Sequence, residues 1–424
     1  MNERTRKLAR ASWILCGVAF LLRLAFVLYE AHLIPSYALA TVPFQNEAGS
    51  VAAALARGKG FCCLFQQPTG PTAWLAPVYP FFLSCIFRLF GVFTVPSFYA
   101  AAIFNCVFSA MVCLPLFLLA ERIGNRTSAW AAACIWAVFP SAILIPFEWI
   151  WDTSLSALLA ITLLWRTFLL AENPQRGKFI FYGLFWGFCL LTNPALGGVL
   201  PFLLLWLYLR IRSQSPSASP NLVLAIVLAL VVCLPWTIRN AVVFHRLIPV
   251  RSDLPFELWM GNNPIYDEHS REINRITRYE QVHLYAQLGE ARFLDEKGKA
   301  AREFIRTHPA LCLRLAGRRA VAFWLGTATP WQDFLRAGSR LVGSLFLWNA
   351  FTLLGTAGGL LCVALSRRRW FLLVAAFPLA FPVVYYFTQV SLRLRHPCDP
   401  ALALLMALAV TWAWWRPQPN AKLV

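Results

Sequence analysis

The chain has 424 residues, of which 59% are hydrophobic and only 13% are charged, and its formal net charge is +19. This number of charges is too small to cover the surface of a soluble domain of this length. The composition therefore excludes an ordinary soluble protein. The basic residues lie mostly beside apolar segments, where they orient membrane spans and meet anionic lipids, and no nucleic-acid-binding motif accompanies them.

The N-terminal part of the chain predicts seven membrane spans. The first is the apolar run at residues 11–29, which is longer than a usual signal-peptide core. We interpret it as a retained anchor, although Ala38-Leu39-Ala40 resembles a cleavage site. The basic residues that precede it place the N-terminus in the cytoplasm. Four further spans are expected near residues 98–120, 129–145, 153–170 and 222–244. Two short spans are expected between residues 170 and 222. They are separated at Thr192-Asn193-Pro194, because proline cannot continue a helix.

A first outer loop is predicted between the first two spans, at residues 30–97. It contains a short helix at residues 48–55 and an apolar stretch at residues 77–95, interrupted by Arg88, which we expect to lie at the membrane interface. Adjacent Cys62 and Cys63 fall in this loop, and nothing in the sequence shows whether they pair.

The C-terminal part begins with the only long polar region, at residues 245–340, which is predicted to be extracytoplasmic. Its residues 305–325 are partly amphipathic. Three last spans follow near residues 341–365, 370–388 and 399–415, and the basic turn Arg367-Arg368-Arg369 and Arg416 fit the cytoplasmic side.

These elements predict an all-α polytopic membrane protein with about ten transmembrane helices, interfacial helices in the first outer loop and a periplasmic segment between spans seven and eight. Both termini are expected in the cytoplasm. The predicted organisation is an N-terminal transmembrane module at 1–244, an extracytoplasmic segment at 245–340 and C-terminal transmembrane helices at 341–424.

A basic cluster occurs in the short outer loop at residues 389–400, against the usual orientation rule. Arg393, Arg395 and His396 therefore predict an anionic ligand, and phosphate is the best candidate. Arg239, at the end of the seventh predicted span, is a further phosphate candidate, although it could merely extend to the interface.

The carboxylates of the outer side are candidates for catalysis. Glu47 is the only carboxylate between Glu30 and Glu121. It could act as general base on an acceptor hydroxyl or amine, hold a metal or orient a substrate, or it could simply begin the short helix that follows. Asp152, beside Trp149, could bind substrate or cap the fourth predicted span.

Other polar and aromatic residues on the outer side suit sugar recognition, because asparagine bonds hydroxyl groups and aromatic rings stack on sugar rings. The substrate-binding candidates are Asn46, Trp74, Tyr79, Trp149, Asp152, Arg251, Asn262 and Asn263. No Cys/His spacing predicts a metal site, and no P-loop, GxSxG or HExxH motif is present.

The order of these features resembles the membrane-embedded C-type glycosyltransferases, in particular bacterial family-39-like proteins related to protein O-mannosyltransferases and lipid A aminoarabinose transferases. The pieces that carry the resemblance are Glu47 with Val51-Ala52, Gly58-Lys-Gly60-Phe61, Gly70-Pro-Thr-Ala-Trp74, Pro77-Val-Tyr79-Pro80, Trp151-Asp152-Thr-Ser-Leu155, Leu191-Thr-Asn193-Pro194, Pro235-Trp-Thr-Ile-Arg239-Asn240, Gly261-Asn262-Asn263 and Arg395-His396-Pro397.

The resemblance implies an inverting glycosyltransferase in the cytoplasmic membrane. Its donor would be a hexose or pentose on a polyprenyl phosphate, and its acceptor a lipid, glycan or protein on the outer side. Glu47 would be the base, and Arg239, Arg393 and Arg395 would hold the phosphate. Many relatives carry Asp, often Asp-Glu, about one helical turn before Glu47, where this chain has Phe44-Gln45-Asn46, and some carry Lys where Ala76 stands.

Two other classes of function stay open at this stage: a transporter or flippase for a lipid-linked sugar, and a non-catalytic partner in polysaccharide assembly. A transporter often shows paired broken helices in an internal repeat, whereas this sequence shows one break, at Asn193-Pro194. The expected partners are a polyprenyl-phosphate sugar, membrane lipids and the acceptor, without nucleic acid. Whether a divalent cation assists is left open.

Overall fold

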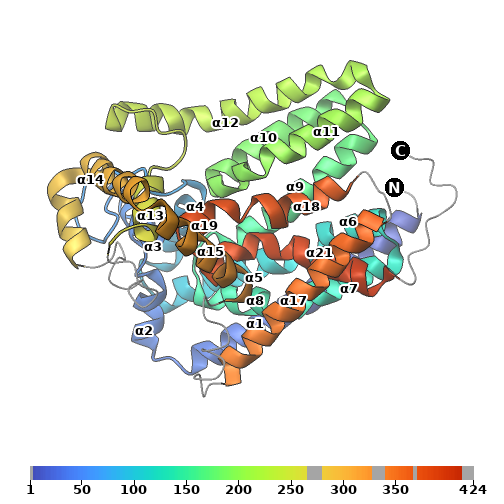
Figure 1. Ribbon diagram of the computed structural model, residues 1–424. Coiled ribbons are helices and arrows are strands. Elements are labelled where there is room, and N and C mark those ends of the chain that lie inside the picture. Colours follow the sequence, from blue (N-terminus) through green and yellow to red (C-terminus); the bar gives the residue numbers. More distant parts are fainter. Residues whose placement is uncertain (1–2, 265–278, 327–339, 366–369, 413–424) are drawn as a thin grey trace.

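The protein is a bundle of helices, seen in a computed structural model that describes residues 3–264, 279–326, 340–365 and 370–412 (Figure 1). The first outer region contains α2 (Ser36–Thr41), α3 (Glu47–Ala56) and α4 (Val78–Phe90), which follow α1 (Glu3–His32). No strand occurs in these described ranges; an isolated bridge joins Cys62 to Pro71.

The long helices follow the predicted spans closely. The N-terminal bundle continues with α5 (Val95–Met111), α6 (Cys113–Ile123), α7 (Arg126–Ala137), α8 (Pro140–Glu148), α9 (Thr153–Glu172), α10 (Arg176–Thr192), α11 (Leu200–Gln214) and α12 (Pro220–Phe244). The outer segment contains α13 (Leu254–Gly261), α14 (Tyr279–Thr307) and α15 (Pro309–Leu325). The C-terminal part contains α17 (Arg340–Leu365), α18 (Phe371–Ala380), α19 (Val383–Phe387), α20 (Leu392–Arg395) and α21 (Asp399–Val410).

Six stretches within the described residues are long and apolar enough to cross a membrane. They are Ser12–His32, Val95–Ile123, Arg126–Glu148, Thr153–Glu172, Pro216–Phe244 and Leu347–Leu365. The polytopic all-α class is thereby confirmed. The other four predicted spans coincide with the shorter helices α10, α11, α18–α19 and α21, so the count of about ten stays a prediction, as does the division into three segments. Arg367 to Arg369 and Arg416 lie outside the described residues.

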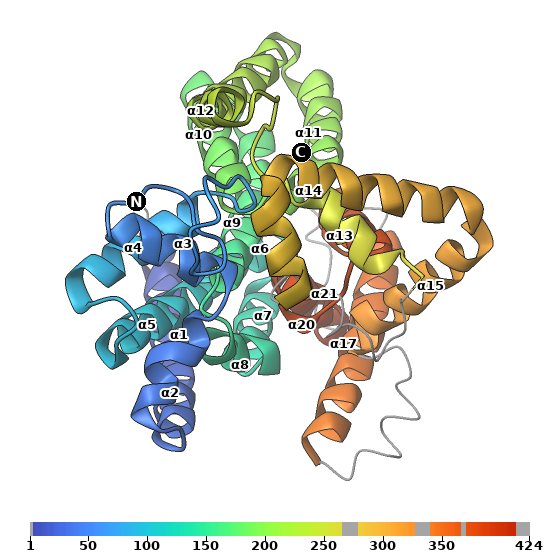
Figure 2. The same cartoon turned by 90° about the vertical axis from the view of Figure 1, so that its left-hand side faces the viewer.

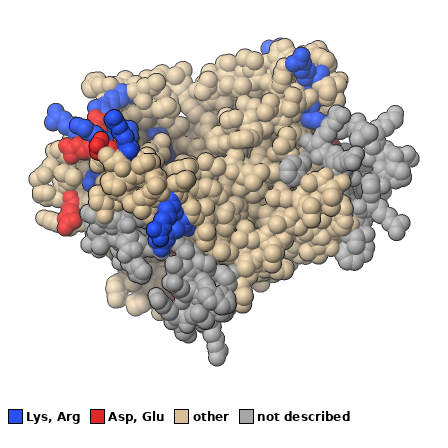
Figure 3. Space-filling view, viewed as in Figure 1, with Lys and Arg blue, Asp and Glu red and all other residues tan. Residues whose placement is uncertain are grey.

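The surface supports a membrane position for the bundle. On the face shown, charged side chains gather over α14 and α15 and at the opposite end, with an uncharged band between them (Figure 3). On α12, apolar side chains such as Val223, Leu230 and Val242 are more than half exposed. Such a band is expected of helices that face lipid.

The helix breaks fall at prolines or at polar caps. Between α10 and α11, the Asn193 side chain accepts a hydrogen bond from the Ala195 amide at 3.1 Å, so the predicted break at Asn193-Pro194 is confirmed. Between α7 and α8, buried Arg23 of α1 donates to the carbonyls of Trp136 and Ala137 at 3.0 and 3.1 Å. Arg23 thus satisfies carbonyls that the end of α7 leaves free.

The described part of the C-terminal helix α21 packs along α7 and α17. At its end, Thr411 contacts Ser128 at the start of α7, with 2.7 Å between the hydroxyls. The start of α1 lies at this same end of the molecule, whereas α3, α13 and α14 gather at the other end (Figures 1 and 2). The predicted outer elements therefore share one end of the bundle.

Candidate active site

A cleft opens at the end of the molecule where the outer elements meet. Its walls come from the start of α3, the loop before α4, α4 itself, the α8–α9 turn, the end of α10 and the loop after α12. The lining residues are Ala48, Leu75, Ala76, Tyr79, Pro80, Trp151, Asp152, Thr192 and Arg251. Of the predicted substrate-binding residues, Tyr79, Asp152 and Arg251 therefore line one cleft.

Three more charged side chains act on this cleft. Arg251 and Arg393 both lower the pKa of Asp152, and both lower that of Glu257, while Glu47 raises the pKa of Glu257. The structure thus brings together Glu47, Asp152, Glu257, Arg251 and Arg393, which come from four separate parts of the chain. Arg251 also forms an ion pair with buried Asp253, so four carboxylates and two guanidinium groups share one neighbourhood.

Arg393 is held over the α8–α9 turn by two tryptophans. Its guanidinium carbon lies 4.8 Å from the ring centre of Trp149 and 4.7 Å from that of Trp151. Such cation–π contacts orient a guanidinium and leave its N–H groups free for a ligand. Trp149 therefore supports Arg393, in addition to the sugar-stacking role that its sequence position suggests.

Asp152 belongs to a short polar chain that begins at the helix break of α10. The Asn193 amide lies 3.2 Å from Ser156 Oγ, which in turn donates to Asp152 Oδ2 at 2.7 Å. Asp152 directly precedes α9, but its side chain bonds no backbone amide there. The Asp152 side chain therefore does not cap α9, which was the alternative that the sequence left open.

Burial raises the pKa of Asp152 and of Glu257 above their ordinary values. For Asp152, the Ser156 hydroxyl and the two arginines oppose that rise. For Glu257, Arg251, Arg393 and a hydrogen bond from Gln389 at 2.7 Å oppose it. Carboxyls with raised pKa values in a cleft are candidates for proton transfer.

Glu47 is the first residue of α3, where the helix dipole favours a negative charge. The preceding residue, Asn46, is the N-cap: its side chain accepts from the Gly49 amide and donates to the Pro43 carbonyl, both at 2.8 Å. Gly49 is required for packing, since a Cβ there would lie 2.3 Å from the Phe44 carbonyl oxygen. The structure thus places Asn46 in a cap that fixes the direction of Glu47.

The predicted phosphate candidate Arg239 lies elsewhere. Its guanidinium donates to the Thr72 carbonyl at 2.7 Å and to the Phe61 carbonyl at 3.0 Å, and it packs 5.0 Å from the Trp236 ring centre. On the other side of Thr72, buried Glu290 accepts from the Thr72 hydroxyl at 2.5 Å and from the Ala73 amide at 2.8 Å. We call Arg239 and Glu290 the loop clamp, because they fix the loop that carries Leu75 and Ala76.

Three further candidates are buried in packing roles. Trp74 packs among Phe256, Tyr285 and Phe293. Asn262 donates to the Leu258 and Phe387 carbonyls at 2.9 and 2.8 Å, and Asn263 donates to the Trp259 carbonyl at 2.8 Å. The structure therefore does not bring these three side chains to the cleft, although it uses them to dock α13.

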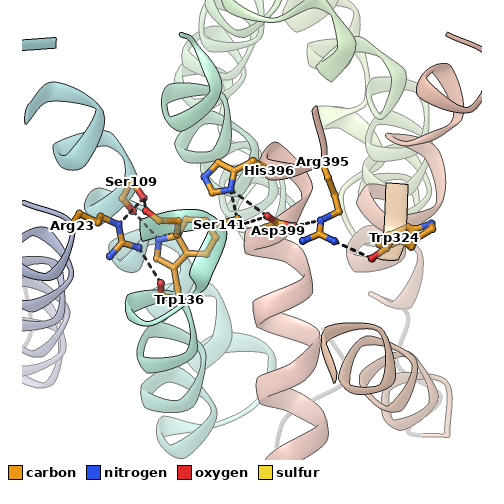
Figure 4. Close-up of polar contacts among 9 residues, drawn as sticks. Arg23, Ser109, Trp136, Ser141, Trp324, Arg395, His396 and Asp399 are labelled. Carbon is orange, nitrogen blue, oxygen red and sulfur yellow. Dashed lines mark hydrogen bonds and ion pairs between the residues drawn. The ribbon is translucent and has the colours of Figure 1, made fainter. Parts of the chain in front are cut away.

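Arg395 and His396 form a buried polar network with Asp399 and Ser141, two partners that were not among the predicted site residues. Arg395 donates to Asp399 at 3.0 Å and to the Trp324 carbonyl at 3.0 Å. Ser141 donates to Asp399 at 2.6 Å, and His396 Nδ1 lies 3.2 Å from the same carboxylate oxygen (Figure 4). Arg395 and His396 thus lie inside the bundle, and of the basic loop cluster Arg393 alone reaches the charges of the cleft.

The residues described do not supply an evident set of metal ligands. Within the described ranges, no group of three or more His, Cys, Asp or Glu side chains could hold a metal ion. The carboxylates of the cleft instead have Arg251 and Arg393 near them. We therefore derive no step through a cation.

Sequence reasoning did not select Glu257, Ser156 or Thr192 for the site. Arg251 and Glu257 are six residues apart in a loop rich in unusual residues, which was the available signal for Glu257. Ser156 and Thr192 lie inside apolar helices, and only the packing of α9 against the end of α10 reveals them.

Comparison with known proteins agrees with this fold. The family model described as dolichyl-phosphate-mannose-protein mannosyltransferase matches residues 71–238, which include Tyr79, Trp149 and Asp152 but not Glu47, Arg251 or Arg393. No curated protein sequence matches the chain significantly.

Among solved structures, the apo oligosaccharyltransferase of Archaeoglobus fulgidus superimposes with a TM-score of 0.55 and 15% identity, over 95% of this chain and 51% of that one. The same protein, AglB, in complex with an inhibitory peptide and a dolichol-phosphate gives 0.51 and 15%, over 95% and 50%. ArnT from Cupriavidus metallidurans bound to undecaprenyl phosphate gives 0.39 and 14%, over 94% and 77%. The chain spans about half the length of the archaeal structures.

The chain is thus a polytopic membrane protein with the fold of the archaeal oligosaccharyltransferase. Over residues 71–238, the match to the mannosyltransferase family model confirms the resemblance to family-39-like proteins that the sequence predicts.

Proposed function

We propose that the protein is an inverting glycosyltransferase that moves a hexose or pentose from a polyprenyl-phosphate donor to a lipid, glycan or protein acceptor. The work takes place on the outer side of the cytoplasmic membrane, with both termini in the cytoplasm. The observation that carries the proposal is the meeting of four carboxylates, Glu47, Asp152, Asp253 and Glu257, with Arg251 and Arg393 around one cleft. That AglB was solved with a dolichol-phosphate supports this class of donor.

The charges of the cleft suit both parts of such a transfer, the deprotonation of the acceptor and the departure of the lipid phosphate. Glu47 takes a proton from the acceptor hydroxyl or amine, and the acceptor oxygen or nitrogen attacks the anomeric carbon. The bond from that carbon to the phosphate oxygen breaks on the opposite face, so the configuration inverts. Arg393 stabilises the negative charge that the departing polyprenyl phosphate gains. Arg251 stands beside it in an ion pair with Asp253 and orients the phosphate.

Asp152 is placed to orient the sugar, because it lines the cleft and is itself held by Ser156. It is also the alternative base, since burial raises its pKa toward the working range of a proton acceptor. Glu47→Gln and Asp152→Asn keep the size of each side chain and remove its basicity, so the two variants separate these roles.

The test is sugar transfer by the purified protein in liposomes that contain polyprenyl-phosphate sugars. We expect Glu47→Gln to lower kcat by about 100-fold or more, as for loss of a general base, and Asp152→Asn mainly to raise KM. Glu303→Gln, an exposed carboxylate on α14, is the matched control and should keep full activity. Full transfer by Glu47→Gln would exclude it as the base, and net movement of the intact lipid-linked sugar without transfer would favour a flippase.

A further inference from the structure

The first outer loop forms a fixed hairpin at residues 59–72. The Cys63 amide donates to the Gly70 carbonyl at 3.1 Å, and the Thr72 amide donates to the Phe61 carbonyl at 3.2 Å. The loop clamp holds this hairpin through the carbonyls of Phe61 and Thr72. The hairpin therefore has a defined shape, and the chain runs on from it to Leu75 and Ala76, which line the cleft.

Two adjacent thiols lie together in this hairpin. Cys62 and Cys63 are both partly exposed, and their sulfur atoms lie 2.8 Å apart. Neighbouring side chains on an extended backbone point to opposite sides. Here Cys63 has a positive φ of 66°, which non-glycine residues seldom adopt. With this backbone conformation, the two sulfur atoms lie on the same side of the chain. The backbone of the hairpin thus presents the two thiols as a pair.

We propose that Cys62 and Cys63 are an oxidation site, where a vicinal disulfide forms reversibly by exchange with a disulfide-containing oxidant of the extracytoplasmic space. The inference rests on the outer placement of this loop in the proposed function, because disulfides persist in that compartment. It adds to that function a modification of the loop which borders the cleft.

The chemistry is thiol–disulfide exchange. One thiolate attacks a sulfur of the oxidant and forms a mixed disulfide, and the neighbouring thiolate then displaces the oxidant as a dithiol. The two thiols lose two protons and two electrons, and the oxidant gains the electrons. Burial and the hydrogen bond with Cys63 raise the pKa of Cys62 to about 11, which slows attack by Cys62.

The resulting ring is expected to be easily reduced. Adjacent Cα atoms across a trans peptide lie about 3.8 Å apart, which is closer than in an ordinary disulfide. Disulfides with such departures are the labile ones. The oxidised and reduced forms of the hairpin should therefore interconvert under mild thiol treatment.

The test is differential alkylation followed by mass spectrometry of the full-length protein. Membranes are treated with N-ethylmaleimide, and the protein is purified, reduced and treated with iodoacetamide. We expect the peptide with Cys62 and Cys63 to carry no maleimide and two carbamidomethyl groups. Without reduction, it should be lighter by two hydrogen atoms.

Two outcomes would overturn the proposal: maleimide on both thiols even after treatment with oxidised glutathione, or a stable mixed disulfide in place of the ring. Neither readout requires sugar transfer, so the proposed function can fail independently. A membrane-impermeant maleimide, applied to intact cells after mild reduction, tests the outer placement separately. Cys62→Ser is the control, because Cys63 then has no neighbouring thiol and should react with maleimide without reduction.

Discussion

Arg395 and Asp399 form an ion pair across 3.0 Å in which the two side chains are only 2% and 0% exposed. Two residues earlier on the same short helix, Arg393 lies over Trp149 and Trp151 at the cleft. The network of Asp399, Ser141 and His396 thus fixes α20 from the inside, and α20 presents Arg393 on the outside.

We expect Asp399→Ala to destabilise the protein by about 3–5 kcal/mol, because it leaves the charge of Arg395 buried without its partner. Chemical unfolding in detergent measures the loss. The control is Glu172→Ala, which removes an exposed ion pair with Arg122 whose side chains are 34% and 51% exposed, and which should cost about 0–1 kcal/mol. Equal losses in both variants would contradict a structural role for the buried pair.

Arg393→Ala should weaken binding of undecaprenyl phosphate to the detergent-solubilised protein without lowering its stability. Loss of one charge-assisted contact should cost about 1.5–3 kcal/mol of binding free energy. Arg393→Lys should restore only part of it, because lysine lacks the planar guanidinium that stacks on the two tryptophans. Exposed Arg306 on α14 supplies the control, Arg306→Ala, and equal affinity for both alanine variants would remove Arg393 from the site.

The pH dependence of transfer should respond to Ser156. The Ser156 hydroxyl lowers the pKa of Asp152, against the larger effect of burial, so Ser156→Ala should raise that pKa further. Since deprotonated Asp152 is the working form, the acidic limb of the kcat/KM profile should move to higher pH. The control is Ser154→Ala, because Ser154 lies in the same turn of α9 and is also buried. If both variants show the same acidic limb of the kcat/KM profile, the protonation of Asp152 does not determine that limb.

The stability should depend on pH in a related way. The folded-state pKa of Glu257 is raised by burial, so protonation favours the folded state. The contribution of Glu257 to the free energy of unfolding is therefore largest below its ordinary pKa of about 4.3 and falls as pH rises through the raised value. In Glu257→Gln, the free energy of unfolding should fall less steeply between the ordinary and the raised pKa of Glu257. An unchanged dependence on pH in this range would show that Glu257 does not cause the fall.

The loop clamp should be visible in hydrogen exchange. Glu290 accepts hydrogen bonds from Thr72, Ala73, Ser252 and Tyr285, so Glu290→Ala should speed amide exchange in the hairpin at residues 59–72. The helices of the bundle should keep their protection. Glu303→Ala leaves these contacts intact and should leave exchange in the hairpin unchanged.

The sequence predicted the helices well because their signals are local. Apolar length marks the spans, and Pro194 marks the break between α10 and α11. The helix α4 was also foreseen, from an apolar run that Arg88 interrupts, and its position at the membrane interface stays a prediction. Such features depend on neighbours along the chain, so one sequence is enough to predict them.

The candidate site was predicted only in part, because a site depends on which loops meet. Glu47, Asp152, Arg251 and Arg393 were selected for their charge on the outer side, and the structure brings them together. Arg239 and Arg395 looked the same from the sequence, yet one holds a loop and the other is buried. Periodicity along one segment cannot show which carbonyl or carboxylate another segment places beside it.

The opposite settings of Arg393 and Arg395 have a consequence for insertions and deletions. One added residue within α20 would rotate the helix by about 100° and so turn Arg393 off its tryptophans or pull Arg395 from Asp399. Surface loops usually tolerate such length changes, but this short segment should not. Two contacts constrain its length together: the ion pair of Arg395 with Asp399 inside the bundle, and the packing of Arg393 on the tryptophans at the cleft.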